Sequence, residues 1–249
     1  MTIAIVAAMP EELAPLRARL VGATRASHAG LAVERGRLAG RQVALAATGD
    51  GARNARTGAA ALLAAGSDVA SLIVLGVSGA LSPELATADL VVASRVIDEA
   101  GQAREADAAR VAATVQATGG RAGVVVSARR IADSAEEKRR LAQQAGAGPA
   151  VVDLESAAYV EAAAAAAIPW IVLRAVSDRA DEALPALLNR SLDPGGAVNR
   201  GRVLRGLFGD PGALPQLLAL RKRVGQCAEV LARAAVAALP VCAPMRGAA

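Results

Sequence analysis

Acidic side chains that could carry acid–base chemistry stand shortly after apolar runs of the chain. Glu12, Glu155 and Asp178 each follow such a run within a few residues. The chain contains a single His and two Cys, Cys227 and Cys242. A Ser-His-Asp hydrolase, a zinc site and a disulfide framework are therefore poor interpretations. If the protein is a catalyst, its acid–base chemistry must depend on carboxylates.

Each of these acids also has a structural interpretation. Glu12 would lie in the first turn of an expected helix, and on the pattern alone compensation of the helix dipole explains it better than catalysis does. Asp153 would cap the next helix, whereas Glu155 fits dipole compensation and catalysis about equally. Asp178 follows Ser177 at the end of an apolar run. A helix cap and a functional acid both fit Asp178, and we favour the functional acid.

Two further segments bear on chemistry. Arg174 lies inside an apolar run, and a buried guanidinium without a partner is costly, so we expect a carboxylate from Glu12 or Glu155 beside it. The segment TGDGAR at 48–53 could present backbone N–H groups to an anion. It matches neither the P-loop pattern nor GxGxxG, so an ordinary turn from strand to helix is the preferred interpretation.

The composition excludes several classes of binding protein. Aromatic residues make up 1% of the 249 residues, so the stacking platforms of proteins that bind single-stranded nucleic acid are absent. The formal net charge is +5, but only Lys138 and Lys222 are lysines, and the arginines are scattered. We attribute the charge to compositional bias. The basic run 221–223 fits a solvated helix face better than contact with anionic lipid.

Apolar runs that alternate with helical segments must position these residues. The alternation predicts an α/β fold with a mostly parallel sheet covered on both faces, and such sheets bind ligands at the carboxyl ends of their strands. We expect strands at 3–8, 31–38, 41–47, 71–77, 89–97, 121–127, 150–153 and 169–175. We expect helices at 52–65, 104–118, from 134, at 155–167 and at 214–239 with an interruption near Gly225, and irregular structure over 185–211.

The start of the chain runs directly into an apolar segment without the pattern of a signal peptide. The longest apolar run, 162–173, contains Pro169 and is short for a membrane span. We therefore expect a cytoplasmic protein with one domain over residues 1–249.

Four segments in order resemble the nucleoside phosphorylase and nucleosidase superfamily, especially its methylthioadenosine/S-adenosylhomocysteine nucleosidase branch. They are IAIVAAMPEE at 3–12, GVSG at 76–79, VDLES at 152–156 and VLRAVSD at 172–178. The resemblance implies a three-layer αβα sandwich around a twisted, mostly parallel mixed sheet, usually in a dimer or hexamer. It also implies cleavage of a nucleoside N-glycosidic bond without a metal or cofactor, with inorganic phosphate as a co-substrate in the phosphorolytic members.

The resemblance assigns a role to each matching residue. Asp178, assisted by Ser177, would protonate or hydrogen-bond the purine at N7, and Glu155 would hold the ribose hydroxyls and stabilise the cation. Glu12 would activate water in a hydrolase, and Arg174 and Ser78 would position the nucleophile. The remaining residues expected to bind substrate are Leu154, Ile131, Ala132, Gly49 and Gly51.

The sequence departs from the family pattern at two positions. Phosphorolytic relatives often carry an Arg shortly before the serine turn, where this chain has Leu75, so phosphate would have to be met by Arg174, the 49–51 loop, Arg53 or Arg56. Ile131 stands where the nucleosidases place an aromatic ring on adenine, so the base would lie between aliphatic groups.

The C-terminal third, from about 185 to 249, resembles the hopanoid-associated phosphorylases through the segments 177–185 and 214–221. This likeness implies adenosylhopane as the substrate, with release of adenine. The Leu-rich stretch 203–220 and the basic residues after it could border an apolar pocket or rest on a membrane surface as a peripheral contact, but a C-terminal helix packed on the sheet fits the helix at least as well. One alternative is a hydrolytic methylthioadenosine/S-adenosylhomocysteine nucleosidase. The other is a non-catalytic nucleoside-binding or membrane-docking protein. In each case we expect a small-molecule nucleoside partner, no nucleic acid, and a homo-oligomer.

Overall fold

The computed structural model describes residues 1–64, 67–193, 200–207 and 212–242. The strands of this part of the chain are β1 (Thr2–Ala7), β2 (Val21–His28), β3 (Leu31–Leu38), β4 (Arg41–Ala47), β5 (Val69–Ala80), β6 (Leu90–Ile97), β7 (Ala103–Glu105), β8 (Arg121–Ser127), β9 (Ala150–Asp153) and β10 (Trp170–Asp178). Its helices are α1 (Pro10–Arg17), α2 (Ala52–Leu62), α3 (Ala108–Thr118), α4 (Ala135–Ala145), α5 (Ser156–Ala165), α6 (Leu187–Arg190), α7 (Arg200–Leu207) and α8 (Ala213–Cys242).

The strands form one mixed sheet in the order β10-β6-β8-β9-β5-β1-β4-β3-β2. The pairings β4–β1, β1–β5 and β5–β10 at its centre are parallel. The long strand β5 also pairs with β9, and β10 pairs with β6, so β5, β10, β6, β8 and β9 close into a ring. The carboxyl ends of β5 and β10 therefore lie side by side at one edge of this ring, with Asp178 opposite Gly79.

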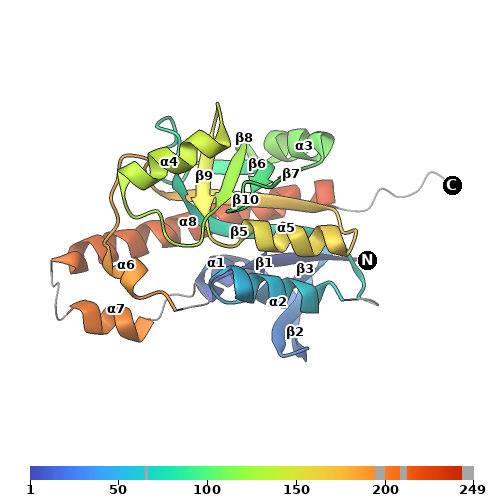
Figure 1. Cartoon of the computed structure of the whole chain (residues 1–249). Helices are drawn as coiled ribbons and strands as arrows, with labels where there is room; N and C mark the ends of the chain where they lie inside the picture. Colours follow the sequence, from blue (N-terminus) through green and yellow to red (C-terminus); the bar gives the residue numbers. More distant parts are fainter. Residues whose placement is uncertain (65–66, 194–199, 208–211, 243–249) are drawn as a thin grey trace.

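Side chains of the central strands alternate between two cores because successive residues of a strand point to opposite faces. In β1, Ala4 and Val6 belong to the core under α2 and α5, whereas Ile3 and Ile5 belong to the core under α1, α3 and α8. Strands buried on both faces carry continuous apolar sequence, which is why the runs are so regular. Figure 1 shows α2 and α5 in front of the sheet and α8 behind it. The α/β fold with a mixed sheet between helices is thus confirmed.

Three expectations about elements were wrong. The segment 104–118 is not helical throughout, since β7 pairs with β6 and the helix begins only after Asp107, whose side chain accepts a hydrogen bond from the backbone N–H of Arg110 at 2.7 Å. The segment 185–211 contains α6 and α7. Helix α8 continues through Gly225 without interruption, because its second half packs on the sheet and holds it helical.

Strand β2 was not expected. All eight of its residues are exposed, so the strand has no apolar face to signal it, and it forms by antiparallel pairing with β3. Pairing at the edge of a sheet needs backbone hydrogen bonds but no burial. Sequence patterns built on burial cannot detect such a strand.

Helix α8 is long and apolar enough, by length and composition, to cross a membrane. Its second half is a core helix, because Cys227, Leu231, Ala235 and Leu239 are buried against the sheet. Its first half extends beyond the sheet toward α6 and α7 (Figure 1).

Candidate active site

A pocket of about 290 Å³ opens where the carboxyl ends of β5 and β10 meet the loops after β1, β8 and β9. Residues from α8 and from the segment around α6 close its other side. The acidic and hydroxyl side chains that line it are Glu12, Asp50, Ser78, Asp153, Glu155, Ser177 and Asp178. Its apolar lining includes Val77, Ile131, Val152, Leu154, Leu184, Leu188, Leu220 and Val224. None of the described lining residues is Lys or Arg.

Glu12 is held at both carboxylate oxygens. Its Oε2 accepts a hydrogen bond from the backbone N–H of Met9 at 2.9 Å, and its Oε1 accepts one from the N–H of Val77 at 2.8 Å. The hydrogen bond from Met9 lies at the start of α1, where the dipole interpretation places Glu12. The hydrogen bond from Val77 ties the same carboxylate to β5 at the pocket. Burial raises the pKa of Glu12, and the two backbone N–H groups oppose this rise. A carboxylate that is held in one orientation and has a raised pKa is suited to accept a proton.

Arg174 lies behind the pocket and is 1% exposed. Its Nη2 pairs with Oδ2 of Asp153 at 2.5 Å and donates a hydrogen bond to the hydroxyl oxygen of Ser156 at 2.8 Å. The expected partner was Glu12 or Glu155. The ion pair forms with Asp153 instead, although the charges of Glu12 and Glu155 also interact with Arg174. Oδ2 of Asp153 also accepts the N–H of Ser156, the first residue of α5, at 2.9 Å, which holds the carboxylate beside Arg174. The N-cap residue of α5 is Glu155 and not Asp153.

Arg174 fits beside β5 only because residue 76 is Gly. A Cβ placed on Gly76 would lie 1.5 Å from Nη1 of Arg174 and 3.4 Å from Oε1 of Glu12. The glycine therefore brings the guanidinium next to the Glu12 carboxylate, and the Arg174 charge lowers the pKa of Glu12 against the effect of burial.

Glu155 precedes α5, and its Oε1 accepts a hydrogen bond from the backbone N–H of Gly51 at 2.7 Å. Burial, followed by the charge of Asp153, raises the pKa of Glu155 to about 8. In the TGDGAR loop, the backbone N–H of Gly51 therefore binds a carboxylate of the protein itself. This agrees with the interpretation of the loop as a turn between β4 and α2.

Asp178 receives a donor at each oxygen. The hydroxyl of Ser177 lies 2.6 Å from Oδ1, and Nζ of Lys138 donates to Oδ2 at 2.6 Å. Asp178 is therefore not a helix cap. A Cβ on Gly79 would lie 2.8 Å from Oδ2, so this glycine provides the space for the carboxylate.

The structure brings most of the expected site residues to this pocket. Those that line it are Glu12, Ser78, Ile131, Ala132, Leu154, Glu155, Ser177 and Asp178. Gly49 and Gly51 do not line it, and Gly51 reaches it only through its hydrogen bond to Glu155. Leu75 is buried in the core under α8.

Two polar residues in contact with the site were missed by sequence reasoning. Asn189 accepts the N–H of Ile131 at 3.0 Å and donates to the C=O of Ile131 and to Asp133, both at 2.7 Å. It thereby fixes the loop after β8 that supplies one wall. Lys138 is the other, and its one signal in the sequence was that it is one of two lysines in a chain rich in arginine.

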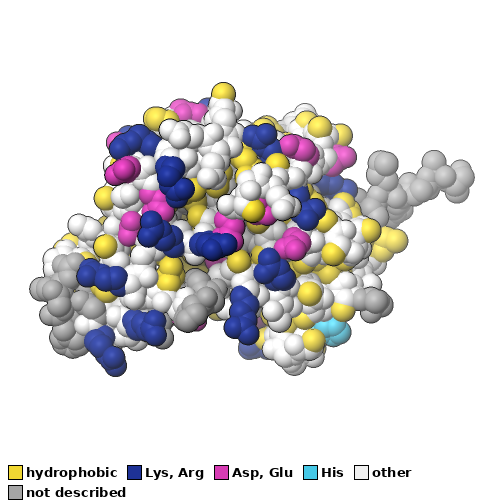
Figure 2. Space-filling view, viewed as in Figure 1, with side chains coloured by type: hydrophobic (Ala, Val, Ile, Leu, Met, Phe, Trp, Pro, Cys, Tyr) yellow, Lys and Arg dark blue, Asp and Glu magenta, His cyan; other side chains and the backbone are white. Residues whose placement is uncertain are grey.

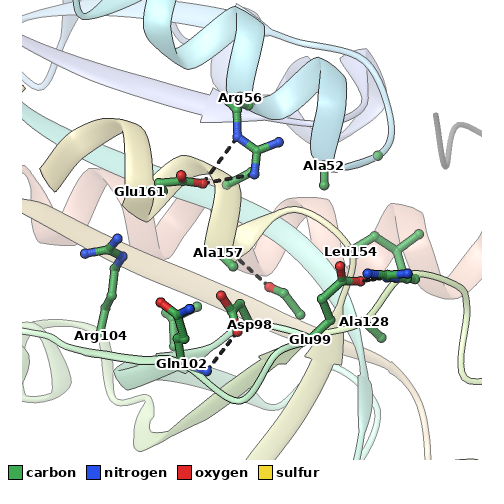
Figure 3. Close-up of a pocket in the computed structure, with 15 residues that line it drawn as sticks. Ala52, Arg56, Asp98, Glu99, Gln102, Arg104, Ala128, Leu154, Ala157 and Glu161 are labelled. Atoms are coloured by element: carbon green, nitrogen blue, oxygen red, sulfur yellow. Dashed lines mark hydrogen bonds and ion pairs between the residues drawn. The ribbon is translucent and has the colours of Figure 1, made fainter. Parts of the chain in front are cut away.

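A second cavity of about 590 Å³ lies between α2, α5 and the loop after β6. In Figure 3, Arg56 of α2 points toward Glu161 of α5, and these two side chains form an ion pair with an N–O distance of 2.9 Å. Arg129 and Glu99 form a second ion pair at this cavity. Arg56 is thus paired with Glu161 and does not line the 290 Å³ pocket. Among the described residues, no group of three or more His, Cys, Asp or Glu side chains could hold a metal ion.

Comparison with known proteins gives a consistent family. The profile of the family described as Phosphorylase superfamily matches residues 2–194. The 5'-methylthioadenosine/S-adenosylhomocysteine nucleosidase of Mycobacterium bovis is 41% identical over 97 residues, which are 39% of this chain and 37% of that protein. The corresponding nucleosidase of Mycobacterium tuberculosis gives the same values. The match therefore spans little more than a third of these curated relatives.

Solved structures match over nearly the whole chain. The S-adenosylhomocysteine nucleosidase of Streptococcus pyogenes, in complex with 5-methylthiotubericidin, has a TM-score of 0.75 and 23% identity, with 96% of each chain covered. The futalosine hydrolase of Helicobacter pylori has a TM-score of 0.75 and 18% identity, with 96% of this chain and 97% of that chain covered. At these identities the similarity establishes the fold.

Proposed function

The chain belongs to the phosphorylase superfamily, and we propose that it is a nucleosidase that hydrolyses the N-glycosidic bond of a 5′-substituted adenosine and releases adenine. The observation that carries the proposal is the pocket itself. It gathers carboxylates from the ends of several strands and offers no Lys or Arg among its described lining residues. Such a lining favours a cationic transition state over a phosphate anion, which supports hydrolysis.

In the proposed reaction, Asp178 donates a proton to N7 of the purine while the C1′–N9 bond breaks and its electron pair passes to the base. The sugar becomes a ribosyl oxocarbenium ion. Glu155 binds the ribose hydroxyls and, in its ionised form, stabilises the positive charge. Both acids line the same pocket, so one nucleoside can meet them together.

Water then adds to C1′, and Glu12 takes the proton that the water loses. The N–H groups of Met9 and Val77 hold this carboxylate in one orientation. Arg174 acts from behind, since its guanidinium is paired with Asp153 and moderates the charge beside Glu12. In this proposal neither a metal nor a cofactor takes part.

The proposal is tested by measuring adenine release from methylthioadenosine with and without inorganic phosphate. We expect turnover that does not depend on phosphate. Turnover that requires phosphate would overturn the hydrolytic mechanism, and binding without any turnover would support the non-catalytic alternative.

A second candidate is the hopanoid-associated phosphorylase, with adenosylhopane as its substrate. The apolar wall favours it: Leu184, Leu188, Leu220 and Val224 lie on the side of the pocket formed by α8 and the segment around α6. The outer face of α8 also exposes Leu214 and Leu218. A polycyclic 5′ substituent would suit such surroundings. Release of adenine from adenosylhopane, with phosphate required, would establish this candidate over the first.

The cellular location and the oligomeric state are part of the same proposal. We propose a cytoplasmic homo-oligomer, dimer or hexamer, that takes a small nucleoside and no nucleic acid. Light scattering of the purified protein measures the oligomeric state directly.

A further inference from the structure

Lys138 is a buried ammonium that sequence reasoning did not connect with the site. It lies on α4, and 1% of the Lys138 surface is exposed. Its Nζ donates to Oδ2 of Asp178 at 2.6 Å, to the C=O of Arg179 at 2.6 Å and to the C=O of Glu182 at 2.9 Å. An ammonium has three donors, and all three have acceptors here. Lys138 therefore has no donor left for a substrate, and any effect it has must pass through its partners.

Lys138 is the cation in direct contact with Asp178. From α8, Arg223 and Cys227 interact electrostatically with Asp178, but both guanidinium Nη atoms of Arg223 bind the carboxylate of Glu182 at 2.7 Å. From β5 and β9, the uncharged Gly79 and Val152 lie at this position: a Cβ built on Gly79 would be 2.8 Å from Oδ2 of Asp178 and 3.2 Å from Cγ1 of Val152.

We propose that Lys138 is a positioning residue that holds the Asp178 carboxyl group in the orientation in which it meets N7 of the leaving base. The inference rests on the proposed function. The Lys138 ammonium holds Oδ2 at 2.6 Å, and the Ser177 hydroxyl lies 2.6 Å from Oδ1. The carboxyl group therefore keeps one orientation while the proton passes to N7 and the C1′–N9 electron pair goes to the base.

A purely structural role predicts a different result. Lys138 also ties α4 to the loop after β10, and loss of this tie would slow the reaction of every substrate alike. An effect through Asp178 is confined to leaving groups that need a proton. The two roles are therefore separated by the leaving group.

The experiment compares two substrates in Lys138→Met and Lys138→Gln. Methylthioadenosine needs a proton on its base, whereas the 4-nitrophenyl riboside with the same 5′ group expels a stable phenolate. We expect adenine release to fall by about 10- to 100-fold, part of what a general acid contributes, and nitrophenolate release to stay within about 3-fold. The ratio of the two rates in one preparation does not depend on the folded fraction. Lys138→Gln keeps an amide donor without the charge, so it serves if the Met variant fails to fold.

Two controls complete the test. Lys222→Gln, at the exposed second lysine, should change neither rate. Binding of methylthiotubercidin, whose base carries carbon in place of N7, should change by less than about 3-fold in the Lys138 variants. Equal losses on both substrates, or no loss on either, would overturn the inference. Absence of adenine release from the unaltered protein would instead overturn the proposed function, and the inference with it.

Discussion

At the scale of single residues, the site consists of buried carboxylates that each have assigned partners. Glu12 is held by two backbone N–H groups, Glu155 by one, and Asp178 by Ser177 and Lys138. Buried charges are stable only when such partners are present. Each acid can therefore be altered with a defined consequence.

Replacing Asp178 by Asn should reduce adenine release by roughly 10²- to 10⁴-fold, because the amide cannot give a proton to the base. The change also leaves the Lys138 ammonium buried without its carboxylate, which should destabilise the fold by about 3 kcal/mol. Rates normalised to the folded fraction and a thermal melt separate the two effects. Near-normal activity per folded molecule would refute the role of Asp178. The double variant Asp178→Asn/Lys138→Met should recover stability but not activity.

Glu155 should make stability depend on pH. Its pKa in the folded protein, about 8, is raised above the ordinary value of 4.5, so the stability it contributes is full below pH 4.5 and is lost as pH rises through 8. The amide in Glu155→Gln cannot ionise, so this variant does not lose stability as the pH rises. Its melting temperature relative to the parent should therefore increase from pH 5 to pH 9, by an amount equivalent to a few kcal/mol at most.

The matched control for this comparison is Glu161→Gln, which removes an exposed carboxylate paired with Arg56. Its difference from the parent should stay nearly constant over the same pH range. A constant difference for Glu155→Gln would show that Glu155 is ionised in the folded protein at all these pH values.

The sequence predicted the residues of the site better than their contacts. Glu12, Glu155 and Asp178 could be placed at strand ends because apolar runs locate the strands. The partner of Arg174 could not be predicted. Glu12 and Glu155 were the expected partners, whereas the pairing with Asp153 depends on how its carboxylate is held by the N–H of Ser156 in the folded chain. Lys138 was missed because α4 approaches β10 only in the folded chain.

At the scale of elements, the close approach of β5 and β10 depends on glycine. Gly76→Ala should displace the Arg174 guanidinium, because its Cβ would lie 1.5 Å from Nη1. We expect destabilisation of about 1–3 kcal/mol by overpacking, together with a loss of adenine release of at least about 10-fold. Gly225→Ala is the control: the position is helical, exposed and free of atoms within 4 Å, so stability should rise slightly, by up to about 1 kcal/mol. Equal melting temperatures for Gly76→Ala and the parent would contradict this packing.

The same contrast explains which elements could be predicted. Strands buried on both faces, such as β1 and β5, have continuous apolar sequence and were found. The exposed β2 and the short α6 and α7 have no comparable pattern and were not. Gly225 suggested a helix break because glycine in a helix costs about 1 kcal/mol relative to alanine. The packing of the following turns on the sheet stabilises the helix by more than this cost.

At the scale of the whole molecule, the first half of α8 joins the apolar side of the pocket to the outer surface. Leu220 and Val224 line the pocket, whereas Leu214 and Leu218 are 46% and 55% exposed. Lys222 follows Leu218 by four residues, on the same face of the helix. Figure 2 shows further basic side chains, in dark blue, over the part of the molecule that carries α6 and α7. Exposed leucines beside basic groups are the arrangement by which a helix rests on an anionic membrane.

If the substrate is lipid-linked, this surface should bind vesicles. We expect the protein to sediment with vesicles that contain phosphatidylglycerol more than with neutral phosphatidylcholine vesicles, and less at high salt, since each basic residue near the surface contributes about 1 kcal/mol. Leu214→Ser/Leu218→Ser should abolish most of this binding without changing hydrolysis of methylthioadenosine. Val21→Ser removes an apolar side chain that is 70% exposed on the distant β2 and should leave vesicle binding unchanged. If all variants sediment equally, or if the unaltered protein does not sediment with vesicles, the membrane contact is contradicted. Methylthioadenosine-like nucleosides would then be the favoured substrates of the pocket.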